Sequence, residues 1–342
     1  MDGLVDRIRD ESHLEDLMTT PSAALVADLR AVDGDIVVIG AGGKMGPTLA
    51  LLARRAAPEK RVFAVARFSE PGLRERLVTA GIECVTADLL DSSQVERLPA
   101  ARNVLFLAGR KFGSAGHADL TWAMNAYVPA LVAQRYSESR IVAFSTACVY
   151  PFVDVASGGA PESTPAAPPT GEYANSCVAR EQLFTYFSKL HGTPGRLIRL
   201  SYAIDMRYGV LHDVARRVLA REPVDVTTGH VNVIWQGDAN TMVLRALRHC
   251  TEPCSPLNIS GPELVNIRAL AQTFGERFGR EPCIVGTEAP AAWLVDTREA
   301  TSCFGYPSVP LGRLIDWTAD WLLRDLRSLN KATHFEARDG AY

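Results

Sequence analysis

A short glycine-rich loop, between an apolar run and an amphipathic stretch, is the feature that most constrains the fold. The sequence DIVVIGAGGKMG spaces Gly40, Gly43 and Gly46 three residues apart and leads into the helical pattern KMGPTLALLARRA. Glycines permit a tight turn and a close approach of the backbone to a ligand, and the following helix offers free N–H groups and a partial positive charge. In this strand–turn–helix context, the spacing predicts that main-chain amides between Ile39 and Met45 hold the pyrophosphate of a dinucleotide.

Apolar runs and amphipathic stretches alternate from this loop onward. After DIVVIG come the runs RVFAVAR, IECVTAD, NVLFLAG, RIVAFST and GRLIRLS, with helical patterns between them. Continuous apolar strands that alternate with helices are typical of a parallel sheet covered on both faces. The sequence therefore predicts an α/β fold, a Rossmann-like doubly wound parallel sheet, with a smaller C-terminal α/β substrate-binding lobe.

The pattern divides the chain into four parts. Residues 1–32 are predicted to form an N-terminal helical arm, 33–200 the dinucleotide-binding domain and 201–328 the substrate-binding lobe. Residues 329–342 show no apolar period and are predicted to form a mobile tail. The loop VASGGAPESTPAAPPTG, rich in proline and glycine, is long enough to suggest that it borders a site.

Composition excludes several classes of protein. The 342 residues carry a formal net charge of −3, so the chain lacks the basic surplus expected for binding nucleic acid. No stretch approaches the roughly 18 apolar residues of a membrane span, and the charged start lacks the apolar region of a signal peptide. Cys250 and Cys254 lack the further ligands that a zinc site needs. We therefore expect a cytoplasmic protein with a small-molecule substrate and no metal.

The end of the second predicted strand bears on which dinucleotide binds. An acidic side chain there usually accepts hydrogen bonds from the adenosine ribose of NAD, whereas an arginine suits the 2′-phosphate of NADP. This chain has Ala66 and Arg67 at that place, and Lys44 in the glycine loop adds a second positive charge. These residues favour NADP over NAD. The alternative is that Arg67 is a solvated surface charge at the end of the strand and does not bind the cofactor.

Several segments, in the same order, resemble the extended short-chain dehydrogenase/reductase family of the NAD-dependent epimerase/dehydratase type. The segment TADLLD resembles the one whose aspartate contacts adenine, VLFLAG resembles the fourth strand, and Asn125 in WAMNAY matches an asparagine of the following helix. The resemblance extends over roughly residues 35–325. Together with the glycine loop, it implies cofactor contacts by Gly40, Gly43, Lys44, Met45, Gly46, Arg67, Asp88, Leu89, Ala108, Gly109 and Tyr173.

The most specific match is VAFSTACVYP, which resembles the family's fifth-strand segment with a serine or threonine before Ala-x-Val-Tyr. It implies that Thr146 is the catalytic hydroxyl and that Ala147 lies beside the substrate. PESTPAAPPTGEYANS resembles the loop that leads to the catalytic tyrosine, here Tyr173. The resemblance implies hydride transfer at a hydroxyl or carbonyl carbon by an epimerase or a dehydrogenase. It also implies a homodimer formed through the helices that hold Asn125 and Tyr173.

Two positions depart from the family pattern. The lysine expected four residues after Tyr173, on the same helix face, is replaced by Cys177. A neutral thiol cannot lower the pKa of the Tyr173 phenol by its charge. It also cannot replace the hydrogen bond that the lysine makes to the nicotinamide ribose. The stretch GHVNVIWQGDA keeps Asp238 but has Val231 or Asn232 where nucleotide-sugar enzymes usually carry an arginine. A small sugar-like compound or polyhydroxy acid is therefore favoured over a nucleotide sugar.

Three interpretations of Cys177 remain open. In the first, Tyr173 still exchanges the proton, helped by Thr146 and by a cation such as Arg180 or Lys111. In the second, Tyr173 only hydrogen-bonds the substrate, and the base is one of His117, Glu172 and His212. In the third, catalysis is lost and the chain senses a dinucleotide for a partner protein.

The stretch IDMRYGVLHD, after the sixth predicted strand, is expected to hold further substrate contacts. Open α/β sheets bind ligands at the carboxyl ends of their strands, and this stretch begins there. Arg207, Tyr208 and His212 could bind a carboxylate or hydroxyl groups, with a structural role as the alternative for each.

Overall fold

The six predicted strands, and a seventh from the second half of the chain, form one parallel sheet. The structure is a computed structural model, and it describes residues 4–111, 116–169 and 171–338. The strands are β1 (Ile36–Ile39), β2 (Val62–Ala66), β3 (Glu83–Thr86), β4 (Asn103–Phe106), β5 (Arg140–Thr146), β7 (Gly195–Leu200) and β12 (Ser255–Ile259). Their order is β12-β7-β5-β4-β1-β2-β3, and every neighbouring pair is parallel. The predicted doubly wound α/β fold is confirmed.

The order of the strands creates a crevice at the carboxyl ends of β1 and β4. The chain runs from β1 to β3 toward one edge of the sheet and then returns to place β4 on the other side of β1. The connections that follow these two strands therefore lead away in opposite directions and leave room between them, where open α/β sheets bind their ligands.

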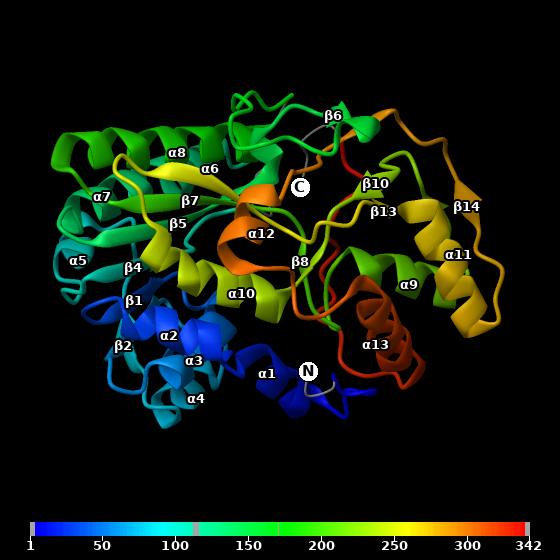
Figure 1. Ribbon diagram of the computed structural model, residues 1–342, viewed down its shortest axis with the longest axis horizontal. Coiled ribbons are helices and arrows are strands. Elements are labelled where there is room, and N and C mark those ends of the chain that lie inside the picture. Colours follow the sequence, from blue (N-terminus) through cyan, green and yellow to red (C-terminus); the bar gives the residue numbers. More distant parts are fainter. Residues whose placement is uncertain (1–3, 112–115, 170, 339–342) are drawn as a thin grey trace.

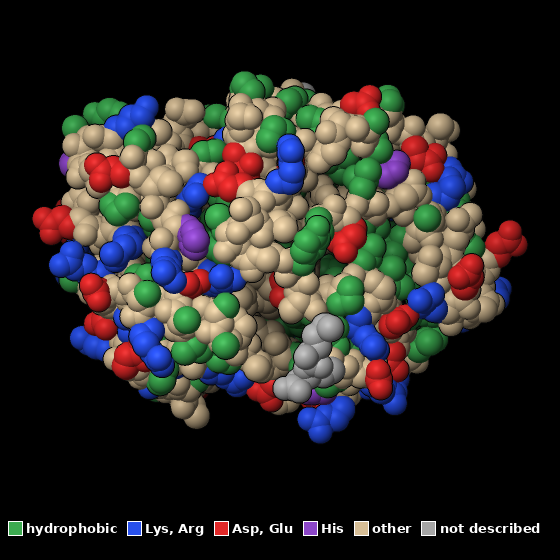
Figure 2. Space-filling model, viewed as in Figure 1, with side chains coloured by type: hydrophobic (Ala, Val, Ile, Leu, Met, Phe, Trp, Pro, Cys, Tyr) green, Lys and Arg blue, Asp and Glu red, His purple; other side chains and the backbone are tan. Residues whose placement is uncertain are grey.

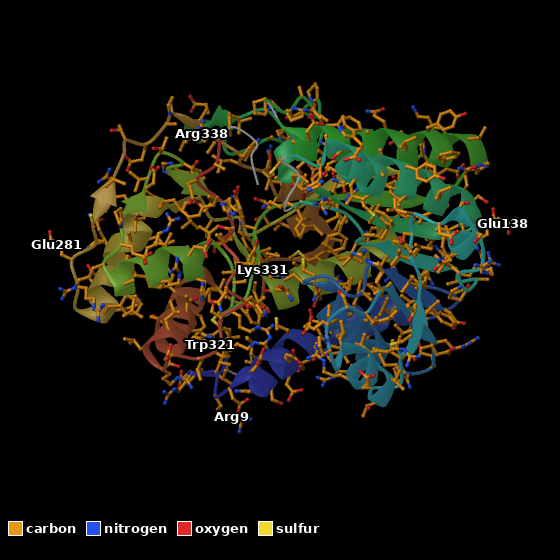
Figure 3. The ribbon with its side chains drawn as sticks, turned by 180° about the vertical axis from the view of Figure 1, so that it is seen from behind. Arg9, Glu138, Glu281, Trp321, Lys331 and Arg338 are labelled. Atoms are coloured by element: carbon orange, nitrogen blue, oxygen red, sulfur yellow. The ribbon has the colours of Figure 1, made fainter. Side chains whose placement is uncertain are left out.

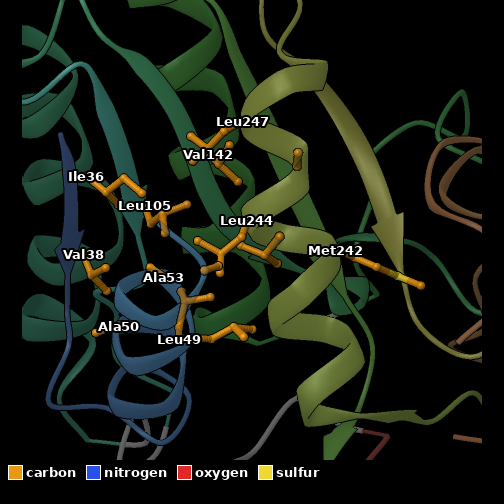
Figure 4. Close-up of a cluster of buried hydrophobic side chains, with 14 of the residues drawn as sticks. Ile36, Val38, Leu49, Ala50, Ala53, Leu105, Val142, Met242, Leu244 and Leu247 are labelled. Carbon is orange, nitrogen blue, oxygen red and sulfur yellow. The ribbon is translucent and has the colours of Figure 1, made fainter. Parts of the chain in front are cut away.

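Helices cover both faces because successive side chains of a strand point to opposite faces. Ile36 and Val38 lie in one core and Val37 and Ile39 in the other. The first face is covered by α2 (Ala23–Arg30), α3 (Gly46–Ala56), α10 (Gln236–Arg245), η4 (Ala246–His249) and α12 (Arg298–Phe304). Figure 4 shows Leu49 and Ala53 of α3 and Leu244 of α10 around the strands. Full burial of each such side chain stabilises the fold by roughly 1.5–3 kcal/mol.

The opposite face carries the helices that follow β3, β4 and β5. They are α5 (Ser92–Glu96), α6 (Ala118–Trp122), the single π-helical turn η1 (Ala123–Tyr127), α7 (Val128–Arg135) and α8 (Glu172–His191). Phe184 of α8 packs edge-on against Phe106 of β4, with ring centroids 5.3 Å apart. A further helix, α4 (Leu73–Thr79), packs beside β3.

The lobe is a second core built mainly by helices, on the right in Figure 1. Its helices are α9 (Val210–Ala220), α11 (Ile267–Phe278) and α13 (Leu311–Leu323). Short strands pair as β8 (Ala203–Ile204) with β11 (Ile234–Trp235), β9 (Val224–Asp225) with β14 (Ile284–Val285), β10 (His230–Val231) with β13 (Val265–Asn266) and β6 (Val153–Asp154) with β15 (Ala291–Ala292). Two short turns of helix, η2 (Ala147–Val149) and η3 (Val155–Ser157), follow β5.

The sequence prediction assigned all of 201–328 to the lobe, but the chain returns from the lobe to the sheet. Strand β12 pairs with Arg196–Leu200 of β7, and α10 covers the sheet. The reason is physical: without β12, strand β7 would present a row of unpaired main-chain groups at the edge of the sheet. Within 201–328, the lobe therefore consists of the segments before α10 and after β12, except α12, which covers the sheet.

The N-terminal helix α1 (Glu11–Thr19) connects the two halves of the molecule (Figure 1). On the side of the sheet, Glu15 pairs with Arg76 at 2.7 Å and Asp16 pairs with Arg55 at 2.9 Å. On the side of the lobe, Glu11 pairs with Arg207 at 2.6 Å. The predicted helical arm is therefore in contact with both halves.

The predicted mobile tail packs against the lobe over its described part, residues 329–338. Phe335 is fully buried in the core of the lobe, and the Thr333 N–H and hydroxyl donate to Asp213 at 2.8 and 2.6 Å. Figure 3 shows this segment rising from Lys331, in the middle of the molecule, toward Arg338. The lack of an apolar period was misleading because a single buried phenylalanine and a few hydrogen bonds hold the segment in place.

The face of the molecule seen in Figure 2 is mixed in charge. On the face seen in Figure 2, acidic and basic side chains are interspersed over both halves. None of the helices within the described ranges is both long enough and apolar enough to cross a membrane.

Candidate active site

The glycine loop forms a cradle that side chains could not share. Gly40 has a φ of +92°, and a Cβ atom there would lie 2.6 Å from the main-chain nitrogen of Ala108. A Cβ atom on Gly46 would lie 2.6 Å from the Cα atom of Ala41, so only glycine allows α3 to start this close to β1. The side chain of Met45, the N-cap residue of α3, makes no capping hydrogen bond. The first N–H groups of α3 therefore remain available to an anion, and the loop fits the pyrophosphate of a dinucleotide.

Two cavities meet at this loop and share Gly40, Gly43 and Leu107 in their walls. The first, about 230 Å³ in volume, contains most of the residues predicted to bind the adenosine end of the cofactor: Arg67, Asp88, Leu89, Ala108 and Gly109. The second, about 290 Å³, contains the predicted catalytic and substrate residues Thr146, Ala147, Tyr173 and Tyr208, together with Lys44, Met45 and Gly46. We call them the adenosine-side and substrate-side cavities.

Lys44 lies in the substrate-side cavity, so it does not join Arg67 as the sequence prediction proposed. Its ammonium group donates to the carbonyl oxygen of Ala203 at 2.7 Å and lies 4.0 Å from the ring centroid of Tyr208. The side chain therefore reaches from the glycine loop into the lobe. Burial lowers the pKa of Lys44 to about 8.

Thr146 and Tyr173 meet at the wall of the substrate-side cavity. Thr146 is the last residue of β5, and Tyr173 lies in the first turn of α8. The two side chains are hydrogen-bonded, and the Thr146 hydroxyl also accepts from the main-chain N–H of Cys148 at 3.2 Å. Burial raises the pKa of Tyr173 well above that of a free phenol, and its neighbours Cys177 and Cys148 raise it further.

Cys177 is fully buried beneath Tyr173 and forms a hydrogen bond with it. Burial raises the pKa of the Cys177 thiol to about 11, so the group is neutral at neutral pH. It cannot supply the positive charge of a lysine, and its burial excludes the covalent role of a reactive thiolate.

A buried cation lies one helical turn further along α8. Arg180 donates to the main-chain oxygen of Phe144 at 2.8 Å and to the side-chain and main-chain oxygens of Asn125 at 2.8 and 3.4 Å. All three acceptors are neutral, and no described carboxylate forms an ion pair with Arg180. Its charge lowers the pKa of both Tyr173 and Cys177.

Asn125, in the π-helical turn, holds this region together. Its amide donates to the main-chain oxygen of Arg110 and to the hydroxyl of Ser176, both at 2.9 Å, and its oxygen accepts from the N–H of Arg110 at 2.8 Å. π-Helical turns occur frequently at functional sites. Here the turn connects the segment after β4 to α8.

Two of the predicted substrate residues do not line either cavity. Arg207 is held by Asp205 at 2.9 Å and by Glu11 at 2.6 Å, and these two carboxylates compensate the burial of its guanidinium charge. His212 is buried in the first turn of α9, and its Nδ1 atom lies 3.7 Å from Asp213. Of the three residues predicted from IDMRYGVLHD, only Tyr208 reaches the substrate-side cavity.

The other alternative bases also lie elsewhere. His117 is exposed ahead of α6, and Glu172 is exposed and accepts a hydrogen bond from the indole of Trp122. Asn232 and Asp238, from the stretch compared with nucleotide-sugar enzymes, are buried and hold main-chain or hydroxyl groups of the lobe. Within the described ranges, no group of three or more His, Cys, Asp or Glu side chains could hold a metal.

Sequence reasoning missed several residues of the substrate-side cavity, namely Tyr202, Cys148 and Thr333. Tyr202 carried a usable signal, because it lies two residues after the end of β7, at the carboxyl end of the sheet. Its φ of +33° is unusual for a residue with a side chain and occurs often at functional sites. Thr333 carried no such signal, since the folding of the lobe alone brings it there.

Comparisons with known proteins agree with this geometry. Residues 36–259 match the family model described as the NAD dependent epimerase/dehydratase family. A search of curated proteins gives no significant match.

Solved structures show the same fold at low sequence identity. DesIV, a dTDP-glucose 4,6-dehydratase from Streptomyces venezuelae with NAD and TYD bound, is 18% identical with a TM-score of 0.71, over 85% of this chain and 97% of that one. A UDP-glucuronic acid 4-epimerase from Bacillus cereus in complex with NAD is 18% identical, with a TM-score of 0.70 over 85% and 99%. MoeE5 in complex with UDP-glucose and NAD is 20% identical, with a TM-score of 0.68 over 85% and 99%. Since the family model covers more than half of the chain, the protein belongs to the NAD-dependent epimerase/dehydratase family of enzymes.

Proposed function

We propose that this protein is an NAD(P)-dependent epimerase or oxidoreductase that acts on a hydroxyl or carbonyl carbon of a small sugar-like compound or polyhydroxy acid. The observation that carries the proposal is the pairing of Thr146 and Tyr173 in a cavity that continues, through the glycine loop, into the adenosine-side cavity. A nicotinamide dinucleotide bound along the loop supplies a hydride acceptor or donor.

The chain's own residues would manage the proton and orient the substrate. The Thr146 hydroxyl would donate a hydrogen bond to the reacting oxygen, and Tyr173 would exchange the proton of that oxygen. The hydrogen bond between Thr146 and Tyr173 supports this proposal, because it keeps the two hydroxyl groups close to each other.

Arg180 is the cation that we propose in place of the missing lysine. It acts on Tyr173 through its charge, from a buried position fixed by three neutral acceptors. A buried charge without an ion-pair partner acts strongly on its neighbours because little solvent screens it. None of the alternative bases His117, Glu172 and His212 lines the substrate-side cavity, which favours the first interpretation of Cys177.

A small substrate is supported by the size of the cavity. Its volume of about 290 Å³ must accommodate the nicotinamide end of the cofactor as well as the substrate. Ligand pockets usually measure about 300–1,000 Å³, so little room remains for a nucleotide. Val231 and Asn232, at the place of the arginine found in nucleotide-sugar enzymes, are buried away from the cavity.

The cofactor itself is a testable part of the proposal. Arg67 is exposed on the wall of the adenosine-side cavity, and we propose that it binds the 2′-phosphate of NADP. Replacing Arg67 with alanine should raise the KM for NADP about tenfold, since a charge-assisted hydrogen bond contributes about 1.5–3 kcal/mol, and should leave the KM for NAD within about twofold. Steady-state kinetics with both cofactors measure this. Equal effects on NADP and NAD would contradict the assignment.

A homodimer is proposed from exposed apolar side chains on the face of α6, η1 and α8. Trp122, Tyr127, Tyr186 and Leu190 are 39%, 50%, 58% and 57% exposed. Replacing Tyr186 with glutamate should weaken dimerisation about 10- to 100-fold, because a truncated or charged aromatic anchor at an interface costs 2 kcal/mol or more. Light scattering after size exclusion measures the mass. Glutamate at Tyr306, which is 75% exposed on the lobe, is the control and should not alter the mass.

One experiment tests the activity as a whole. The purified protein is denatured and assayed for released nicotinamide cofactor, and the native protein is then given NADP or NAD with sugars and sugar acids. Tightly retained cofactor with product isomerisation would identify an epimerase, and net change of the cofactor would identify a dehydrogenase. Exchangeable cofactor without turnover of any substrate would contradict the proposal and favour a dinucleotide sensor.

A further inference from the structure

The charged side chains in the walls of the substrate-side cavity all have the same sign. Lys44 and Lys111 line it, and no carboxylate does so among the described residues. The remaining polar groups of the wall are neutral hydroxyls and a thiol, because burial raises the pKa values of Tyr202 and Tyr208 well above the usual range. The cavity therefore presents positive charge and hydrogen-bond donors to whatever fills it.

Lys44 reaches this wall from the glycine loop. Its ammonium group has three donors, of which one is used by the carbonyl oxygen of Ala203. No described carboxylate lies within ion-pair distance of Lys44. The two acidic side chains that act on it from a distance are engaged elsewhere: Asp205 pairs with Arg207 at 2.9 Å, and Asp213 accepts from Thr333 at 2.6 Å.

Lys111 reaches the same wall from the segment after β4. Its ammonium group donates to the carbonyl oxygen of Thr333 at 3.4 Å, and Thr333 itself lines the cavity. Burial lowers the pKa values of Lys44 and Lys111, and the charge of Lys111 contributes to the shift at Lys44. Burial disfavours the charged form of both ammonium groups, so an anion bound at this wall would stabilise both charges.

We propose that Lys44 and Lys111 form a binding subsite for one anionic group of the substrate, a carboxylate or a phosphate monoester. This inference rests on the proposed function and specifies its substrate class: a compact polyhydroxy anion. A purely structural role for Lys44, as a link between the glycine loop and Ala203, would need only one donor and no second lysine. Lysine suits either anion because its ammonium acts as a point charge rather than as a planar fork.

Binding of three matched polyols to the protein tests the subsite. D-Gluconate carries a carboxylate, glucitol 6-phosphate carries a phosphate, and glucitol is neutral. Affinities are measured by calorimetry at saturating NADP or NAD, after cofactor binding has been established, for the wild type and for Lys44→Met, Lys111→Met and Lys60→Met. Lys60 is the control because it also donates to a main-chain carbonyl, that of Val32 at 2.6 Å, but lines neither cavity.

We expect at least one anionic polyol to bind more tightly than glucitol. Lys44→Met should weaken the binding of that anion about 10- to 100-fold, as expected for the loss of one charge-assisted contact, and should not change the binding of glucitol. Lys60→Met should bind the anion as tightly as the wild type does. Preference for gluconate identifies a carboxylate, and preference for the phosphate ester identifies a phosphate. The subsite would be overturned if both anions bound no better than glucitol. It would also be overturned if Lys44→Met and Lys111→Met had an unchanged Tm and bound the anions as tightly as the wild type. Failure of the wild type to bind a cofactor would instead overturn the proposed function.

Discussion

Replacing Tyr173 with phenylalanine should reduce kcat by about 10²- to 10⁴-fold, the usual contribution of a positioned proton donor or acceptor. The substitution removes one hydroxyl and keeps the ring, so the wall of the cavity retains its shape. Thr146 would still hydrogen-bond the reacting oxygen but could not exchange its proton. The affinity for the dinucleotide should change by no more than about threefold, because the pyrophosphate is held by the glycine loop.

The measurement is kcat with the substrate found in the panel, together with the Kd of the cofactor. Tyr136→Phe is the control: its hydroxyl donates to Pro99 at 2.9 Å, on a part of the sheet domain that touches neither cavity lined by the glycine loop. That variant should retain activity within about twofold. If Tyr173→Phe retained the wild-type kcat, Tyr173 would be no more than a substrate contact, and the second interpretation of Cys177 would gain support.

Restoring the family lysine, by Cys177→Lys, should lower the free energy of unfolding by about 3–5 kcal/mol instead of improving the enzyme. The position is fully buried, and the new ammonium group would lie one helical turn from the buried Arg180. Glu181, the described carboxylate that acts on this position, is already paired with Arg199 at 2.7 Å. Uncompensated buried charges cost about this much. Cys177→Met, which adds similar length without charge, separates the electrostatic part from the steric part.

The double variant Cys177→Lys with Arg180→Gln tests whether the two cations exclude each other. Removing the Arg180 guanidinium should restore about 1–3 kcal/mol of the free energy of unfolding that Cys177→Lys loses. This is the usual coupling energy between charged groups in contact or in one network. Chemical denaturation of the four proteins of the cycle measures the coupling. An additive result would mean that Arg180 does not occupy the electrostatic role of the missing lysine.

The pH dependence of the lysine variant has a definite sign. Burial lowers the pKa of a lysine in the folded state, so the folded protein binds fewer protons than the unfolded chain at neutral pH. The stability of Cys177→Lys, relative to Cys177→Met, should therefore rise as the pH increases toward about 10, the value for free lysine. Thermal unfolding between pH 7 and 9.5 would reveal this rise.

The fold could be predicted because each of its signals is local. The glycine loop, the six apolar runs and the helical patterns between them are contiguous in the sequence, and each determines its own element. Strand β12 was harder to place, since PLNIS is as apolar as a short strand of the lobe would be. Only the unpaired edge of β7 decides where that strand goes.

The sequence predicted only those site residues that lie at the end of a recognisable strand or on one face of a recognisable helix. Thr146 and Tyr173 were found because each follows directly from a recognisable segment. Arg207 was misplaced because the sequence could not reveal that Glu11, nearly two hundred residues away, pairs with it. Lys44 was assigned to the wrong cavity because a loop residue can point to either side, and the contact with Ala203 decides which.

The core of the lobe is completed by segments from opposite ends of the polypeptide, and this has a consequence for how the molecule is made. Ile8, Leu14 and Phe335 share that core, and the indole of Trp317 donates to the carbonyl oxygen of Val5 at 3.0 Å. Contacts of such high contact order form late in folding. During synthesis, the apolar side chains of α1 emerge long before residues 311–335, so α1 stays without part of its core until those residues have been made.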